Sequence, residues 1–250
     1  MSLPLALLGF VAVGLALGML GGGGSILAVP VLVHLLGIAP NVAVPMSLPI
    51  VGTAAAVGAI ARWRSGQLRL RTTTPFALIT IVASYAAARL GHDIPGRPRM
   101  ILFGLTMFAA AFAMWRRASR MGTVELVSQK RSVAQMIPAA LAVGTLTGIV
   151  GVGGGFLIVP ALTGVLGLAM AEATATSLAV IALNTVAAGW GFVGHVSIDL
   201  RLTAIVIAAA LVGMVIGTRL APRIAARTLT RAFAVLLIVL AIFMLGKELG

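Results

Sequence analysis

The feature that most constrains this sequence is a series of eight apolar stretches, each close to the length that crosses a lipid bilayer. An α-helix needs about 20 mostly apolar residues to span the hydrocarbon core. The stretches are Leu3–Leu20, Val42–Ala61, Thr73–Leu90, Met100–Trp115, Ala134–Val150, Ala173–Val193, Leu202–Leu220 and Leu229–Leu245. The pattern predicts an all-α polytopic membrane protein with eight long transmembrane helices.

Composition and charge exclude most other classes of protein. Hydrophobic residues make up 60% of the chain and charged residues only 9%, whereas soluble domains carry about 25% charged residues. A soluble domain of this size cannot bury so much apolar surface, and a disordered chain would be far more polar. The net charge of +13 lies in short clusters between apolar runs, as in membrane loops. We therefore expect lipid, and not nucleic acid, around the chain.

The residues needed for most enzymes are scarce. The chain has no Cys, three His and five Asp or Glu, scattered along its length. This leaves little for a metal site, a catalytic triad or a pair of carboxylates. A GxxxxGK[ST] phosphate-binding loop is also absent. The sequence predicts no enzyme activity, no metal and no cofactor.

An internal repeat appears when the chain is shifted by 130 residues. From Ala12 to Arg71, nineteen of sixty positions match their partners without a gap, and the matches include glycines, a proline and a serine. Apolar composition alone would not place these residues together. The repeat predicts two homologous halves, residues 1–118 and 132–250, joined by a hydrophilic linker over residues 119–131.

Each half also contains a shorter apolar stretch of about 13 residues that follows a glycine cluster, Ser25–Gly37 and Gly155–Gly167. Such a stretch forms either a half-helix or a thin crossing. If each is a crossing, the halves are inverted, and one side of the membrane holds 13 of the 18 Lys and Arg, against 11 for parallel halves. Cations gather on the cytoplasmic side. The distribution favours inverted halves with the central linker in the cytoplasm.

Duplicated halves whose hydrophobic segments are interrupted at matching positions are typical of secondary transporters, with the substrate at the interface of the repeats. The two motifs GMLGGGGSILAVPVL and GIVGVGGGFLIVPAL, each followed by a Ser-Leu pair, resemble the signature of the sulfite exporter TauE/SafE family. The resemblance covers nearly the whole chain. It implies a multi-pass protein of the bacterial inner membrane that exports sulfite, sulfoacetate or related small organosulfur anions.

The glycine clusters are the main candidates for an anion site. A glycine run breaks a helix, and in lipid such a break survives only where it is buried or lines a cavity. The short helix after each run begins with free N–H groups and a partial positive charge, which together cradle an anion. Two such termini near the midplane would hold a small oxyanion, and the expected absence of a buried Arg would ease its release. Close helix packing is the competing interpretation of the glycines.

Hydroxyl and amide side chains near the breaks are further candidates. They are expected to donate to the oxyanion, although bonds to their own helix or between helices are an equally good explanation. The predicted substrate-binding residues are Gly22, Gly23, Gly24, Ser25, Ser47, Gly153, Gly154, Gly155, Thr176, Ser177 and Asn184.

Two titratable residues are candidates for proton coupling, Glu172 and His34. A helix N-terminal charge is the alternative for Glu172, and simple packing is the alternative for His34. The substrate, the direction of transport and a homodimeric state stay open. An uptake transporter or channel for another small anion is the alternative function, and a non-transporting membrane subunit is another.

Overall fold

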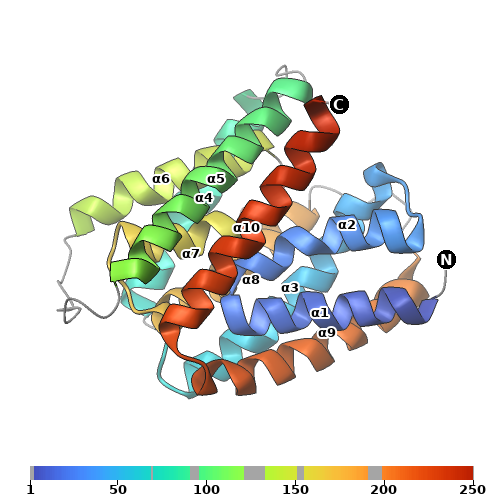
Figure 1. Cartoon of the computed structure of the whole chain (residues 1–250), viewed down its shortest axis with the longest axis horizontal. Coiled ribbons are helices and arrows are strands. Elements are labelled where there is room, and N and C mark those ends of the chain that lie inside the picture. The colour runs from blue at the N-terminus through green and yellow to red at the C-terminus, as the bar shows by residue number, and fades with distance from the viewer. Residues whose placement is uncertain are drawn as a thin grey trace.

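The computed structural model describes residues 3–68, 70–90, 96–120, 133–150, 155–190 and 199–249, and every regular element in these ranges is helical (Figure 1). In chain order the elements are α1 (Leu3–Leu20), η1 (Gly22–Gly24), α2 (Ser25–Leu36), α3 (Pro40–Arg64), α4 (Leu70–Leu90), α5 (Gly96–Arg120), α6 (Val133–Val150), α7 (Gly155–Gly164), α8 (Met170–Trp190), α9 (Leu200–Leu220), η2 (Ala221–Arg223) and α10 (Ala226–Leu249).

The long helices lie where the apolar stretches predict them. Each stretch falls within one helix, except that residues 191–193 of the sixth lie outside the described ranges. Among the described residues, three helices are long and apolar enough to cross a membrane: Leu3–Leu20, Val42–Arg64 and Leu200–Arg223. Shorter apolar helices lie in α2, α4, α6, α7 and α8. The all-helical class is confirmed, whereas eight full crossings stay a prediction.

The helices recur with the period of the sequence repeat. α1 and α6 have the same length and begin 130 residues apart, and so do α4 and α9. The short helices α2 and α7 end alike: Gly37 and Gly167 both have φ of 68°. The N–H of the residue after each glycine donates to a carbonyl six residues back at 3.1 Å. The same local signals therefore produce the same turn twice.

The helices pair across the two halves more than within them. The most extensive packing joins α1 with α9, α4 with α6, α5 with α10, and α3 with α8. Figure 1 shows α1 and α9 side by side along one edge of the molecule. Under the 130-residue shift, the α1–α9 pair becomes the α6–α4 pair. The first helix of each half thus packs on the fourth helix of the other.

Glycines allow the closest of these helix pairs. A methyl group added at Gly14 or Gly18 of α1 would collide with the backbone of α9, where Gly14 meets Met214 and Gly18 meets both Met214 and Thr218. Small residues let helix backbones approach in this way in membranes. Because residues further along α1 meet residues further along α9, the two helices run parallel. These glycines are packing residues.

The central pair, α3 and α8, runs antiparallel. Gly52 of α3 lies against Thr185 of α8, whereas Gly58, further along α3, lies against Leu178, earlier in α8. These two helices are counterparts under the repeat. Two counterparts that cross in opposite directions are the arrangement that an inverted pair of halves requires.

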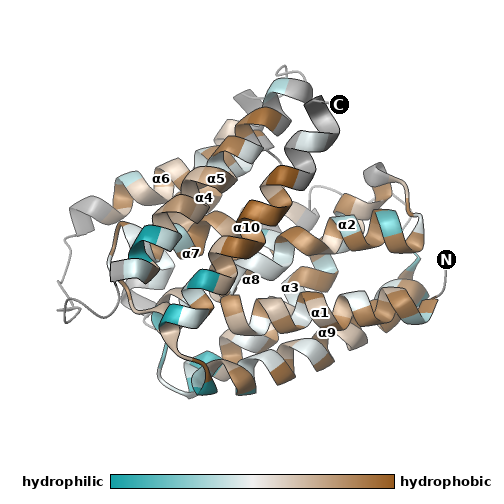
Figure 2. Cartoon of the chain, in the orientation of Figure 1, coloured by the Kyte–Doolittle hydropathy of each residue, from teal (hydrophilic) through white to brown (hydrophobic). Residues whose placement is uncertain are grey.

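The outer surface is apolar, as lipid requires. Large hydrophobic side chains point outward along several helices, among them Leu8, Val82, Phe112 and Val186, each more than 60% exposed. Figure 2 shows brown, hydrophobic residues along the helices and teal, hydrophilic residues mainly at one end of the bundle. A soluble protein would not leave so many such side chains exposed. The fold therefore presents many large apolar side chains to the membrane.

Candidate functional site

The first helix break is built by Gly21. Its N–H donates to the carbonyl of Leu17 at 2.8 Å, which closes the last turn of α1. Its φ of 73° then lies in the left-handed region, which favours glycine. The chain passes through η1, and α2 begins at Ser25 and turns back along α1. The break between α1 and α2 thus lies where the glycine run predicts it.

The first break meets the start of α7 through Gly22 and Gly155. A Cβ added at Gly22 would collide with the carbonyl group of Gly155, and it would lie 2.9 Å from the backbone nitrogen of Phe156. Gly155 and Phe156 form the start of α7 in the second half. The beginnings of the two short helices are therefore in contact at backbone level.

The other glycines of the run each face a different helix. A Cβ at Gly21 would lie 3.0 Å from a methyl carbon of Thr174 in α8, and one at Gly23 would lie 2.7 Å from the ring of Phe233 in α10. A Cβ at Gly24 would collide with the backbone of α1. Gly22, Gly23 and Gly24 are all buried. Each of the four glycines has a different neighbour where a side chain would begin, which explains why the run contains four glycines. In this conformation the break is closely packed.

Two serines approach the same backbone. The Ser25 hydroxyl donates to the Gly22 carbonyl at 2.7 Å, and its oxygen would lie 2.8 Å from a Cβ added at Gly155. The buried Ser177 hydroxyl of α8 donates to the Gly155 carbonyl at 3.4 Å. The structure thus brings together four of the predicted residues, Gly22, Ser25, Gly155 and Ser177.

Asn184 extends this face of α8. Ser177, Ile181 and Asn184 follow at spacings of four and three residues, which places them on one side of a helix. Ile181 reaches within 2.6 Å of a Cβ added at Gly155. The Asn184 Oδ1 atom is buried without a hydrogen-bond partner. An unsatisfied buried amide oxygen costs about 1–3 kcal/mol, so this atom can accept a hydrogen bond only from a donor that the described contacts do not supply, whereas any contact with an anion would have to come from the amide NH2 group.

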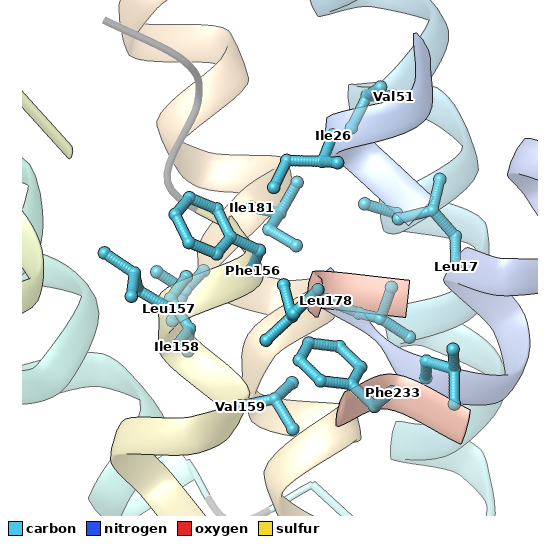
Figure 3. Close-up of a cluster of buried hydrophobic side chains, with 14 of the residues drawn as sticks. Leu17, Ile26, Val51, Phe156, Leu157, Ile158, Val159, Leu178, Ile181 and Phe233 are labelled. Atoms are coloured by element: carbon cyan, nitrogen blue, oxygen red, sulfur yellow. The ribbon is translucent and has the colours of Figure 1, made fainter. Parts of the chain in front are cut away.

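The surroundings of the two breaks are apolar. Figure 3 shows Phe156, Ile181, Leu178 and Phe233 gathered around the start of α7, with Ile26 of α2 close by. All five side chains are buried in the same hydrophobic cluster. A low dielectric strengthens any hydrogen bond that the first N–H groups of a helix make with a charged ligand.

Other predicted residues lie elsewhere. Thr176 receives a hydrogen bond from Thr73 at 3.3 Å, which turns it toward α4. The Ser47 hydroxyl donates to the Val44 carbonyl of its own helix at 2.7 Å. Gly153 and Gly154 lie outside the described residues.

The two candidates for proton coupling lie at helix ends. His34 is exposed near the end of α2, in hydrogen-bond contact with the Pro30 carbonyl at 3.1 Å. That is the end of α2 away from the break. Glu172 lies in the first turn of α8, where a negative charge also stabilises the helix dipole. It is two residues before Thr174, which contacts Gly21.

The structure corrects the expectation that no arginine is buried. Arg62 is only 4% exposed; it donates through Nη2 to the Gly18 carbonyl at 2.6 Å and through Nη1 to Gln67 Oε1 at 3.0 Å. Arg117 donates to the carbonyls of Thr163 and Leu168 at the end of α7. Both arginines lie in basic clusters at helix ends. The sequence alone does not distinguish them from their exposed neighbours, because only the tertiary contacts do so.

Comparison with known proteins identifies a family over nearly the whole chain. Residues 5–244 match the family described as sulfite exporter TauE/SafE. A probable membrane transporter protein of Xylella fastidiosa (strain 9a5c) is 32% identical, over 94% of this chain and 92% of its own length. The probable membrane transporter protein YdhB of Bacillus subtilis (strain 168) is 25% identical, over 82% and 84%. No solved structure matches. The chain belongs to the sulfite exporter TauE/SafE family and is a membrane transporter.

Proposed function

We propose that this transporter carries small sulfur oxyanions, such as sulfite or sulfoacetate, out of the cell across the bacterial inner membrane. The anion binds near the midplane, where the glycine breaks of the two halves meet. The observation that carries the proposal is the backbone contact between Gly22 and Gly155, which brings together two helix beginnings that are 133 residues apart in the chain.

The chemistry of the breaks suits a small anion. The first N–H groups of a helix have no partner within the helix, and the dipole adds a partial positive charge. Two helices that begin side by side double this effect without a formal charge. Ser25 and Ser177 lie against the same backbone, and each hydroxyl can turn from a carbonyl to the anion. Asn184, on the same face of α8 as Ser177, adds an amide NH2 group that can donate to the anion.

Opening of the contact is part of the proposed cycle. Gly22, Gly23, Gly24 and Gly155 are buried against their neighbours, so the present conformation is closed. Inverted halves offer two equivalent ways of opening, one toward each side of the membrane. The antiparallel course of α3 and α8 supports inversion. So does the contact of Arg231, near the start of α10, with the ring of Trp115, near the end of α5.

Export needs no nucleotide. A monovalent anion that leaves a negative interior gains about 2.3 kcal/mol per 100 mV. With inverted halves, the side that carries 13 of the 18 basic residues is the cytoplasm. A positive cytoplasmic surface attracts anions to that mouth of the protein.

Flux into proteoliposomes tests the function. Purified protein is reconstituted, and uptake of radiolabelled sulfite is measured with and without an imposed membrane potential. Thiosulfate, sulfoacetate, sulfate and chloride serve as competitors. Potential-driven sulfite flux that sulfoacetate inhibits more than chloride supports the proposal. Flux of chloride with no response to sulfur oxyanions would assign another anion, and no flux of any anion would favour a non-transporting subunit.

Cysteine labelling tests the inversion. The chain has no native Cys, so Ser65→Cys and Ser197→Cys introduce single labels into the equivalent loops of the two halves. Inverted halves predict labelling by an impermeant thiol reagent from opposite sides of the membrane. Labelling of both from one side would exclude inversion.

A further inference from the structure

Arg62 is the most unusual charged group that the structure describes. It lies in the last turn of α3, and its side chain is 4% exposed. Its two hydrogen bonds go to a backbone carbonyl, that of Gly18, and to the side-chain amide oxygen of Gln67. Neither acceptor carries a charge. The Nε atom is buried without a hydrogen-bond partner.

The guanidinium of Arg62 makes fewer hydrogen bonds than its N–H groups could donate. Arginine stays charged in proteins, and a buried charge is costly unless it is paired and fully hydrogen-bonded. Nε and a terminal nitrogen form one flat edge with two parallel N–H donors, which matches the two oxygens of an oxyanion. Hydrogen bonds to charged groups contribute about twice as much as those between neutral groups. A small oxyanion therefore competes well with the two neutral acceptors.

The position of Arg62 links it to the first break. Gly18 lies three residues before Gly21, where α1 ends and the glycine run begins. The bond from Arg62 therefore holds the end of α1 next to the break. Gln67 belongs to the connection between α3 and α4, on the cation-rich side of the chain.

We propose that Arg62 is a separate loading site for the transported oxyanion on the cytoplasmic side of the glycine breaks. The arriving anion binds the Nε–H and an Nη2–H of Arg62 and displaces the Gly18 carbonyl from Nη2. Loss of the bond to Gly18 frees the end of α1, so binding at the loading site favours opening of the break. This inference rests on the proposed function, because it takes the bound anion to be the transported one.

A purely structural role makes different predictions. As a cap on the end of α1, Arg62 would stabilise the fold whether or not an anion is present. Its replacement would lower the Tm and leave the apparent affinity of the folded protein for sulfite unchanged. The loading site instead predicts a change in KM and in the stabilisation by sulfite.

The test compares four variants in proteoliposome flux and in thermal unfolding with and without sulfite. Arg62→Gln is expected to raise the KM for sulfite about tenfold or more and to lose the rise in Tm that sulfite produces. Arg62→Lys keeps the charge but loses the flat edge, so an intermediate KM is expected. Gln67→Ala removes the acceptor that holds Nη1 in its present orientation, so the guanidinium can turn to the anion more easily and the KM should fall. Arg64→Gln, at an exposed arginine of the same helix end, is the charge-matched control and should behave as wild type.

The outcomes separate the two proposals. A folded Arg62→Gln variant with the KM of wild type overturns the loading site and leaves the proposed function standing. If Arg62→Gln does not fold, Arg62→Lys and Gln67→Ala decide, and an unchanged KM in both overturns the site. Wild-type protein that sulfite stabilises through Arg62 but that carries no anion refutes transport and overturns the loading role, and leaves Arg62 only as an anion-binding site. Wild-type protein whose Tm does not respond to sulfite overturns the loading site.

Discussion

Replacement of Gly22 by alanine should damage both stability and transport. The added Cβ would overlap the carbonyl of Gly155 and lie 2.9 Å from the nitrogen of Phe156. Both obstacles are backbone atoms of the first turn of α7. Ile181 and Ser177 already pack against that turn from α8. These atoms cannot move aside as a side chain does.

The size of the effect follows from the packing. One extra carbon in a well-packed interior costs about 1–3 kcal/mol, and a backbone obstacle places Gly22→Ala at about 3 kcal/mol. For a chain of this size, that lowers the Tm by about 6–12 °C. Sulfite flux should fall at least about tenfold, because the two breaks can no longer close on each other.

Two matched alanine variants calibrate the measurement, which combines thermal unfolding with sulfite flux. Gly164→Ala places the same Cβ in open space at the end of α7, so it should keep the wild-type Tm within about 2 °C and the wild-type flux. Gly23→Ala meets the ring of Phe233, which can shift, so its loss should be intermediate. Gly22→Ala with the Tm and flux of wild type would refute the reasoning, as would an equal loss in Gly164→Ala.

Three further variants test other contacts. Arg117→Met leaves the carbonyls of Thr163 and Leu168 without this donor and should cost about 2–4 kcal/mol in thermal unfolding; an unchanged Tm would contradict the described contact. Asn184→Leu should raise the KM for sulfite about fivefold or more without lowering the Tm, because a buried unsatisfied oxygen is removed; the reverse pattern would make Asn184 structural. Glu172→Gln should flatten the pH dependence of flux, and an unchanged profile would remove Glu172 from proton coupling.

The helix pattern was largely predictable from the sequence. In a membrane the length of an apolar run limits a helix directly, and glycine clusters break it, so α2 and α7 begin where the sequence places them. The family also follows from the paired glycine motifs. Helix length and helix breaks are local features of the sequence. They can be predicted because the thickness of the bilayer constrains each segment separately.

The facing of individual side chains was not predictable. Thr176 and Ser177 are neighbours, yet one turns toward α4 and the other toward α7. A helix that is apolar on all sides gives no periodic signal of which face is inside. Gly14 and Gly18 pack two long helices together, whereas the later glycines form the break. These two roles can be told apart only once the partner helix is known. Burial of Arg62 likewise requires the end of α1, which no local pattern supplies.

The exchange of first helices between the halves has a consequence for biosynthesis. α1 is made about 180 residues before α9, the helix on which it packs most extensively. At about 5–20 residues per second, α1 waits roughly 10–40 s in the membrane without that partner. α6, by contrast, emerges after α4 is already complete. The same pairing is therefore completed about midway through synthesis in one place and only near its end in the other, and α1 lies in the membrane with helices of its own half as its first neighbours.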